Sequence, residues 1–331
     1  MTNAISMTSQ PHDPASASPL DMPLVIVGPL RSGTTLLRLL CDHHPRVSIF
    51  GEFEEAVAML PEQGWIPVGE YVRRLPWYRA FCSSGASLPT SAGDYPEAVQ
   101  TIFAERVAGV DADTVGFCVH SRPDRLPDIW PDAKYIHLRR DPRDVARSCI
   151  GMGWVGTVFH GVKYWRESEQ RIEQMRERVA PESVLTVRFE DLVRRPEAEL
   201  ARICEFLGHE YDPAMLAIDG DTTYSRPDAR LAEQWRHKLT PREIELVEWR
   251  CGEAMTACGY ERRFPEPRGP RAIEMALLRA RNRWNRSRFR VQRYGLGLTV
   301  GWAAAKRIPG GSPVRRRLKR SIDAIDTANL K

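Results

Sequence analysis

The chain has 331 residues, of which 42% are hydrophobic and 27% charged, so it is long enough to bury one large core or two smaller ones. Its seven cysteines are widely spaced and form no Cys-x-x-Cys pair, which argues against a disulfide framework or a zinc site and favours reduced cysteines in a cytoplasmic protein. The net charge of +5 is unevenly distributed, because residues 268–331 carry +14 and leave −9 for the rest of the chain.

The N-terminal segment has the composition of a leader rather than of a folded element. Residues 1–22 are polar and rich in Ser, Pro and Ala, without the basic and apolar parts of a signal peptide, so we expect them to be disordered. No run in the chain approaches the ~20 apolar residues of a membrane-spanning helix.

The first predicted element is a short buried strand over residues 24–27, which leads through a glycine-bounded loop over 28–33 into an apolar helix over 34–42. Such a turn directs backbone N–H groups and the positive end of a helix dipole at one point, and this predicts an anion site. The loop has the spacing of the nucleotide-binding motif G-x-x-x-x-G-K-[ST]. Thr34 stands where that motif has its lysine, which disfavours ATP or GTP hydrolysis, and Arg31 supplies positive charge inside the loop.

The next stretch offers two candidate general bases. A second strand over 47–50 is expected to end at Gly51-Glu52, and a third strand over 114–119 is expected to end just before His120. Glu52 therefore follows a strand at the carboxyl edge of a sheet, where it could accept a proton; the alternative is a solvated glutamate at a helix start. His120 is the rival base, and its alternative is a histidine of a proline-rich connector over 120–131. Helices are predicted over 53–60, 68–81 and 96–108.

A second strand–helix unit supplies further anion donors. The strand over 134–140 leads directly into a helix start, with Asp141 at the N-cap and Pro142 at the first helical position. Arg140 closes the strand and Ser148 lies about two turns into the helix. In an open α/β sheet both loops would meet at the carboxyl edge, where such sheets bind ligands. Further along, a helix is expected over 159–179, and a capping box at Thr240–Glu243 predicts a helix to about residue 258.

These motifs resemble the sulfotransferase superfamily that uses 3′-phosphoadenosine-5′-phosphosulfate (PAPS). Residues 29–35 resemble its 5′-phosphosulfate loop, and residues 140–148 resemble its 3′-phosphate motif. Residues 187–192 resemble the strand and following helix where an aromatic side chain lies near the adenine. The resemblance covers about residues 23–263, and it implies a three-layer P-loop-like α/β fold around a mainly parallel sheet.

The resemblance also implies roles for particular residues. PAPS would be the co-substrate, no metal would be required, and the acceptor would be a hydroxyl of a carbohydrate, a lipid or another small molecule. As in tyrosylprotein-type and bacterial members, Glu52 would be the base, with His120 as the rival and Arg31 stabilising the growing charge. The lysine that supports the bridging oxygen in the cytosolic family is missing, and Arg38, Arg122 and Lys163 are its candidate replacements. The implied nucleotide-binding residues are Arg31, Ser32, Gly33, Thr34, Thr35, Arg140, Ser148 and Phe189.

The basic C-terminal region is predicted to be separate from this domain. We expect a sulfotransferase domain over 23–263, followed by a linker and a partly helical basic extension over 264–331. The extension could be a solvated tail, a helix in peripheral contact with the inner membrane surface, or a nucleic-acid-binding segment, although it contains no specific nucleic-acid reader motif. The alternative functions are a divergent P-loop kinase and a non-enzymatic protein that binds membranes or nucleic acid through this tail.

Overall fold

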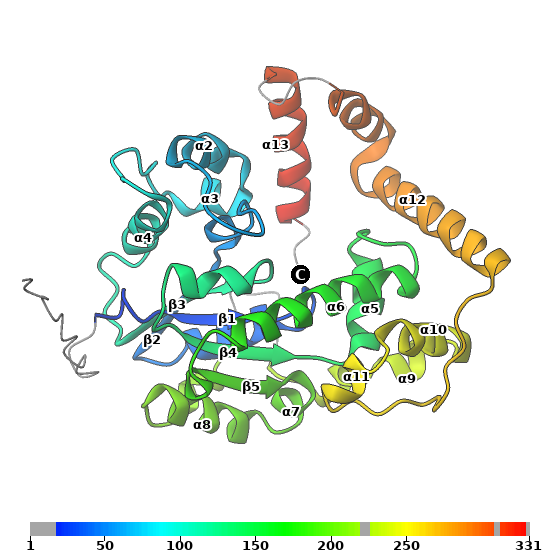
Figure 1. The fold of residues 1–331 in the computed structure, drawn as a ribbon, viewed down its shortest axis with the longest axis horizontal. Helices are drawn as coiled ribbons and strands as arrows, with labels where there is room; N and C mark the ends of the chain where they lie inside the picture. The colour runs from blue at the N-terminus through cyan, green and yellow to red at the C-terminus, as the bar shows by residue number, and fades with distance from the viewer. Residues whose placement is uncertain (1–17, 219–225, 308–311, 329–331) are drawn as a thin grey trace, which may run out of the picture.

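A parallel sheet of five strands forms the centre of the molecule (Figure 1), with the strand order β2-β3-β1-β4-β5. The computed structural model describes residues 18–218, 226–307 and 312–328. All four strand pairs are parallel, so the predicted α/β class with a mainly parallel sheet is confirmed. The strands are β1 (Leu24–Val27), β2 (Val47–Glu52), β3 (Thr114–Val119), β4 (Lys134–Arg139) and β5 (Val184–Arg188).

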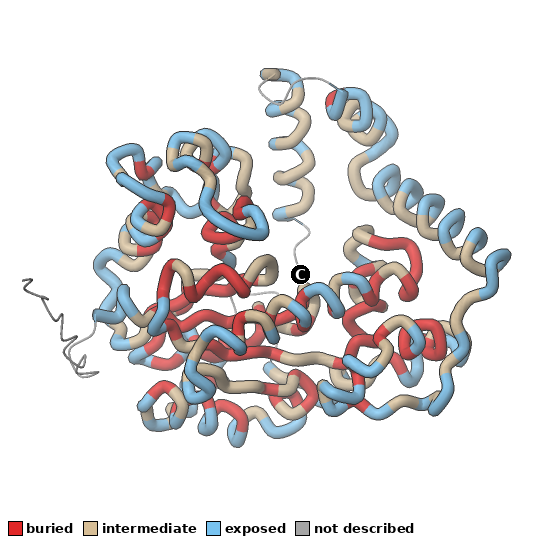
Figure 2. The backbone as a smooth tube through the Cα atoms, viewed as in Figure 1, coloured by how far each residue is buried: buried red, intermediate tan, exposed pale blue. Residues whose placement is uncertain are grey.

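Helices cover both faces of the sheet, which gives three layers. In β1, Val25 and Val27 face a core built with α4 (Tyr95–Arg106) and α6 (Val158–Arg176). Leu24 and Ile26 face the opposite core, built with α1 (Thr34–Asp42) and α8 (Pro196–Leu207). Because β1 is covered on both sides, all four of its residues are buried, as is expected of a central parallel strand (Figure 2).

The described helices begin with α1 (Thr34–Asp42), α2 (Val68–Arg74), α3 (Arg79–Ser84), α4 (Tyr95–Arg106), α5 (Pro142–Gly151), α6 (Val158–Arg176) and α7 (Phe189–Arg194). They continue with α8 (Pro196–Leu207), α9 (Trp235–Lys238), α10 (Pro241–Cys251), α11 (Ala254–Ala257), α12 (Ala272–Ala305) and α13 (Pro313–Ala328).

Two of the predicted helices between β2 and β3 are wrong in extent. The helix predicted over 53–60 is only a 3-10 turn, Glu54–Ala56, because the Phe53 N–H donates to the Cys118 carbonyl of β3 at 2.9 Å and so prolongs the strand pairing. The helix predicted over 68–81 is divided into α2, a 3-10 turn and α3, and Pro76 lies in the break, where it cannot donate a backbone hydrogen bond.

Two later predictions also need correction. The connector predicted over 120–131 contains a 3-10 helix, Pro123–Asp128. The capping box at Thr240 and Glu243 is present, but α10 ends at Cys251 rather than near residue 258. Gly252 has φ 59° and ψ −143°, which turns the chain out of the helix before α11 begins.

The chain after residue 271 forms two helices that stand out from the sheet (orange and red in Figure 1). The base of α12 is held at Gly156, whose N–H donates to Asn282 at 2.6 Å and whose carbonyl accepts from Asn285 at 2.8 Å. The helix bends at Gly295, and α13 returns beside it, joined by a hydrogen bond from Tyr294 to Asp326. None of the helices in the described ranges is long and apolar enough to cross a membrane. Most of the predicted leader, residues 1–17, lies outside the described residues.

Candidate active site

The loop between β1 and α1 requires glycine at both of its ends. A Cβ on Gly28 would lie 2.6 Å from the carbonyl oxygen of Leu138, and a Cβ on Gly33 would lie 2.5 Å from the ring of Phe189. Gly33 also has φ 103°, a left-handed conformation that disfavours any side chain. The loop is therefore packed closely against β4 and against the start of α7, as the two glycines in the sequence indicated.

The start of α1 offers unoccupied hydrogen-bond donors. Gly33 is its N-cap residue and supplies no side-chain acceptor, and no acidic residue lies in the first turn. The first intrahelical bond runs from Leu37 to Gly33, so within the described chain the N–H groups of Thr34 and Thr35 have no acceptor. An anion at this position would satisfy these donors and would lie at the positive end of the helix dipole.

The second predicted anion motif meets this loop directly. The Arg140 guanidinium donates to the backbone carbonyl of Arg31 at 3.2 Å, and its carbon lies 4.0 Å from the centre of the Phe189 ring. From α5, Ser148 accepts a hydrogen bond from Arg31 Nε at 3.0 Å. The two motifs therefore share one site at the carboxyl edge of the sheet. The Arg140 side chain is only 13% exposed, and this burial lowers the pKa of its guanidinium.

A cavity of about 360 Å³ opens beside the loop on the β2 side; we call it the acceptor cavity. Glu52, His120 and Arg38 all face it, whereas Ser32 is fully buried and does not line it. Among the described residues its walls consist of Arg31, Thr34, Thr35, Arg38, Phe50, Gly51, Glu52, Arg79, Ala80, Ser83, Cys118, His120 and Thr327.

The two candidate bases lie side by side in this cavity. Glu52 is 44% exposed, and its Oε1 lies 3.9 Å from Nε2 of His120, which is only 6% exposed. The other ring nitrogen, Nδ1, lies 3.0 Å from the carbonyl oxygen of Gly28. A carbonyl oxygen can only accept, so Nδ1 carries the proton and donates it. In the neutral ring the lone pair of Nε2 therefore faces the cavity, 3.4 Å from the hydroxyl of Thr34.

Glu54 is a supporting residue that the sequence did not single out as part of the site. Its carboxylate accepts from the backbone N–H groups of His120 at 2.5 Å and of Ser121 at 3.2 Å, and also from the Ser121 hydroxyl. Burial raises the pKa of Glu54, and the neighbouring His120 opposes that rise. Glu54 therefore fixes the backbone that carries His120. The Glu52-Phe53-Glu54 sequence at the end of β2 is the signal that could have indicated it.

Only one of the three candidate replacements for the missing lysine lines the acceptor cavity. Arg38 faces it and also donates to the Ile49 carbonyl at 3.2 Å. Arg122 instead donates to the Leu60 carbonyl at 2.8 Å, and Lys163 pairs with Glu167 on the exposed side of α6. Arg79 is a cation that the sequence did not indicate: it comes from α3 and lies 3.8 Å from Glu52.

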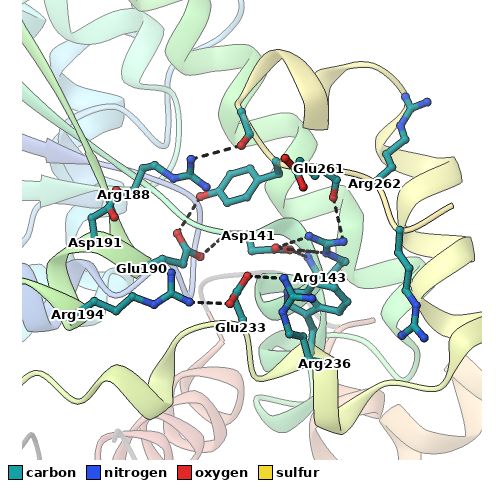
Figure 3. A pocket seen from close by; sticks show the side chains of 14 residues that line it. Asp141, Arg143, Arg188, Glu190, Asp191, Arg194, Glu233, Arg236, Glu261 and Arg262 are labelled. Atoms are coloured by element: carbon teal, nitrogen blue, oxygen red, sulfur yellow. Dashed lines mark hydrogen bonds and ion pairs between the residues drawn. The ribbon is translucent and has the colours of Figure 1, made fainter. Parts of the chain in front are cut away.

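A cluster of charged side chains behind the start of α5 lines a separate cavity of about 620 Å³ (Figure 3). Here Arg143 donates to both carboxylate oxygens of Asp141 and to Glu248 at 2.7 Å. Glu190 accepts from the Asp141 N–H at 3.0 Å. The charge of Arg143 is thus neutralised by Asp141 and Glu248, and this side chain anchors the start of α5. Arg140, the other arginine of the predicted motif, instead contacts the loop between β1 and α1.

The structure also brings together residues that could in principle hold a metal ion. His137 lies on β4, with Glu169 and Glu173 across from it on α6. However, Arg139 lies 3.4 Å from Glu169 and 3.3 Å from Glu173, and it occupies this space with a positive charge. The cluster therefore fits a buried ion-pair network better than a cation site.

Comparison with known proteins identifies the family. The model of the sulfotransferase family matches residues 23–213, more than half of the chain. The chain belongs to this family. A sulfotransferase domain from the Synechococcus PCC 7002 olefin synthase superposes with a TM-score of 0.50 and 26% identity over 73% of this chain and 98% of that domain. A sulfotransferase domain from the curacin biosynthetic pathway has a TM-score of 0.53 at 20% identity, over 72% of this chain and 98% of that domain, and supports the fold.

Among curated sulfotransferases, the relatives act on different acceptors by name. The omega-hydroxy-beta-dihydromenaquinone-9 sulfotransferase of Mycobacterium bovis is 29% identical over 43% of this chain and 39% of its own length. Protein-tyrosine sulfotransferase A of Caenorhabditis elegans is 27% identical over 59% of this chain and 52% of its own length. The matched part of the chain thus spans about half or less of the length of these relatives. Membership of the sulfotransferase family argues against the alternative hypothesis of a divergent P-loop kinase.

Proposed function

We propose that this protein transfers the sulfuryl group of PAPS to a hydroxyl group of an acceptor. The observation that carries the proposal is the junction of two anion motifs, in which Arg140 donates to the backbone of Arg31 and Arg31 donates to Ser148. A nucleotide with phosphates at both its 3′ and 5′ positions requires two such sites at a fixed separation. Membership of the sulfotransferase family supports the same donor.

The nucleotide would lie along the carboxyl edge of the sheet. The N–H groups of Thr34 and Thr35, together with Arg31, would bind the 5′-phosphosulfate. Arg140 and Ser148 would bind the 3′-phosphate, and Phe189 would form a wall for the adenosine beside them. In this arrangement Ser32 shapes the loop from within, since its side chain is fully buried.

In the proposed transfer, the acceptor oxygen forms a bond to sulfur while the bond from sulfur to the bridging oxygen of the phosphosulfate breaks. The electron pair stays on the 5′-phosphate of the departing bisphosphate, where Arg31 and the start of α1 stabilise it. The acceptor proton passes to the Glu52 carboxylate, which is exposed in the acceptor cavity. His120 Nε2, which lies 3.9 Å from Glu52 Oε1, is the competing acceptor for that proton. Arg38 is the cation available in this cavity for the bridging oxygen.

We also propose that the protein works in the cytoplasm, at the inner surface of a membrane. All seven cysteines are free, and five of them are buried in the core, as is typical of a reducing compartment. The charge of +14 on residues 268–331 supports contact with the anionic lipids of that surface.

The nucleotide assignment can be tested with two ligands that differ by one phosphate. Adenosine 3′,5′-bisphosphate should bind more tightly than AMP, measured by calorimetry. Arg140→Ala should reduce affinity for the bisphosphate by about 10- to 100-fold and leave AMP binding nearly unchanged, whereas Arg31→Ala should weaken both. Arg194→Ala, which removes a surface arginine paired with Glu233, is the matched control. Equal affinity of the wild-type protein for both ligands would contradict the assignment.

Transfer itself can be followed with isotopically labelled PAPS. Incubation with cell extract fractions containing carbohydrates, lipids or small phenols should yield a labelled product that depends on the protein and on Arg31. The fraction that becomes labelled identifies the acceptor class, and tight bisphosphate binding without any labelled product in these fractions would contradict sulfuryl transfer.

A further inference from the structure

One side of α12 carries large apolar side chains that the described part of the chain leaves exposed in whole or in part. Ile273, Leu277 and Trp284 are 77%, 64% and 70% exposed, and Val291 is 38% exposed. At 3.6 residues per turn these four side chains fall within an arc of roughly 40°. They therefore form one stripe along the helix, and Figure 2 shows α12 as a mixture of exposed and intermediate residues.

The opposite side of α12 accounts for its attachment to the domain. Asn282 and Asn285 bind the backbone of Gly156, and the ring of Phe289 packs so closely on Gly153 that a Cβ there would lie 2.0 Å from it. The helix is thus already anchored through its inner face. A surface helix anchored in this way ordinarily presents polar side chains to water, so the apolar outer stripe indicates a further partner.

Arginines border this stripe on both sides. Helical geometry places Arg281 and Arg288 along one border, and Arg283 and Arg290 along the other. All four are exposed, and no ion-pair partner for them occurs among the described residues. Long arginine side chains can bury their stems along apolar material while their charged ends reach phosphate groups.

The acidic residues of this region are turned toward partners of their own. Residues 268–331 contain only three: Glu274 pairs with Arg242 at 2.6 Å, Asp323 pairs with Lys319 at 2.6 Å, and Asp326 accepts from Tyr294 at 2.9 Å. The outer surface of α12 is therefore apolar and cationic. A second copy of the same surface would be repelled by its charge, whereas an anionic lipid surface complements both properties.

We propose that this stripe (Ile273, Leu277, Trp284 and Val291) and its bordering arginines form a docking face for an anionic membrane surface. The inference deepens the membrane contact proposed above, and it does not depend on sulfuryl transfer. The helix would lie in the plane of the interface, with the stripe below the headgroups and the arginines among the phosphates. Beyond the bend at Gly295, Leu296 and Val300 are further exposed apolar side chains, at 65% and 57%.

The test is co-sedimentation of the full chain with vesicles of phosphatidylcholine, with and without phosphatidylglycerol. The wild-type protein should bind the anionic vesicles, less so as salt is raised, and should bind neutral vesicles weakly. The double variant Leu277→Ala/Trp284→Ala should have a partition coefficient about 10- to 100-fold lower. Arg281→Glu/Arg288→Glu should lose most of the preference for anionic vesicles.

Matched control variants lie far from α12 in sequence. Leu88→Ala removes an apolar side chain that is 42% exposed, and Arg73→Glu reverses an exposed charge on α2; both should bind vesicles like the wild type. All variants should keep their helical circular dichroism and their stabilisation by adenosine 3′,5′-bisphosphate. That second measurement separates a failure of membrane docking from a failure of the proposed function.

Four results would overturn the docking face. The wild-type protein could fail to bind anionic vesicles, or the Leu277/Trp284 double variant could bind them as well as the wild type. Sedimentation could reveal a dimer that this double variant dissolves, which would assign the stripe to a second copy. Tight binding of an oligonucleotide that depends on Arg281 and Arg288 but not on Leu277 and Trp284 would assign the arginines to nucleic acid.

Discussion

Replacing Gly33 with alanine tests the close packing on which the nucleotide loop depends. The change forces a side chain into φ 103°, which costs about 1–2 kcal/mol for a left-handed conformation. It also places a Cβ 2.5 Å from the ring of Phe189, and such overpacking costs about 1–3 kcal/mol. We therefore expect Gly33→Ala to lower the free energy of unfolding by about 2–5 kcal/mol, which is roughly 5–15 °C in melting temperature.

The two costs can be separated with a matched glycine elsewhere. Gly208 ends α8 at φ 83° and has no atom within 4 Å of a Cβ position, so Gly208→Ala should show only the backbone cost. Thermal unfolding and bisphosphate titration are measured on both variants. Gly33→Ala should also lose bisphosphate affinity, because a displaced Phe189 no longer supports Arg140. Adding Phe189→Ala to Gly33→Ala should then cost less than the two single changes together. If Gly33→Ala is no more destabilising than Gly208→Ala, the packing argument is refuted.

Three further predictions concern the charges of the site and its support. Glu52→Gln should reduce kcat by about 10²- to 10⁴-fold while bisphosphate affinity stays the same. An unchanged rate would assign the role of base to His120, and the turnover of His120→Gln would then test that assignment. Burial raises the pKa of Asp144 to about 6 from its usual 3.8, so the native state binds a proton there that the unfolded chain has lost. The stability that this bound proton adds to the folded state is complete below pH 4 and is lost as the pH rises through 6. Relative to Asp144→Asn, the free energy of unfolding of the wild type should therefore fall by about 3 kcal/mol between pH 4 and pH 7, measured by denaturant titration. Arg143→Met should lower the free energy of unfolding by about 3–5 kcal/mol, because it leaves the buried Glu248 carboxylate without its cation. A loss below 1 kcal/mol would contradict this and show that water takes the place of the Arg143 guanidinium beside Glu248.

The parts of the fold that follow from local sequence were predictable. The strand over 114–119 is β3 with the same limits, and the helix start at Asp141-Pro142 is where α5 begins, because an N-cap and a proline act within one turn. The glycine spacing of 28–33 indicated a tight loop for the same reason. Local rules were insufficient at Phe53, where pairing with β3 overrides helix formation.

The candidate site was predictable only where a motif marks the residue. Arg31 and Arg140 stand in recognisable patterns, and their contact follows from parallel strands that end at one edge. No motif marks Glu54, Arg79 or Thr327, because each reaches the site only through contacts with residues far away in the sequence. Nothing in the order of residues specifies that α3 and the end of α13 approach β2, since tertiary packing decides both.

The position of Thr327 has a practical consequence for how the protein is prepared. This residue lies in the last turn of α13 and forms part of the wall of the acceptor cavity. A shortened chain that lacks α13 would lose this part of the wall. Turnover with bulky acceptors is therefore best compared on protein that retains α13.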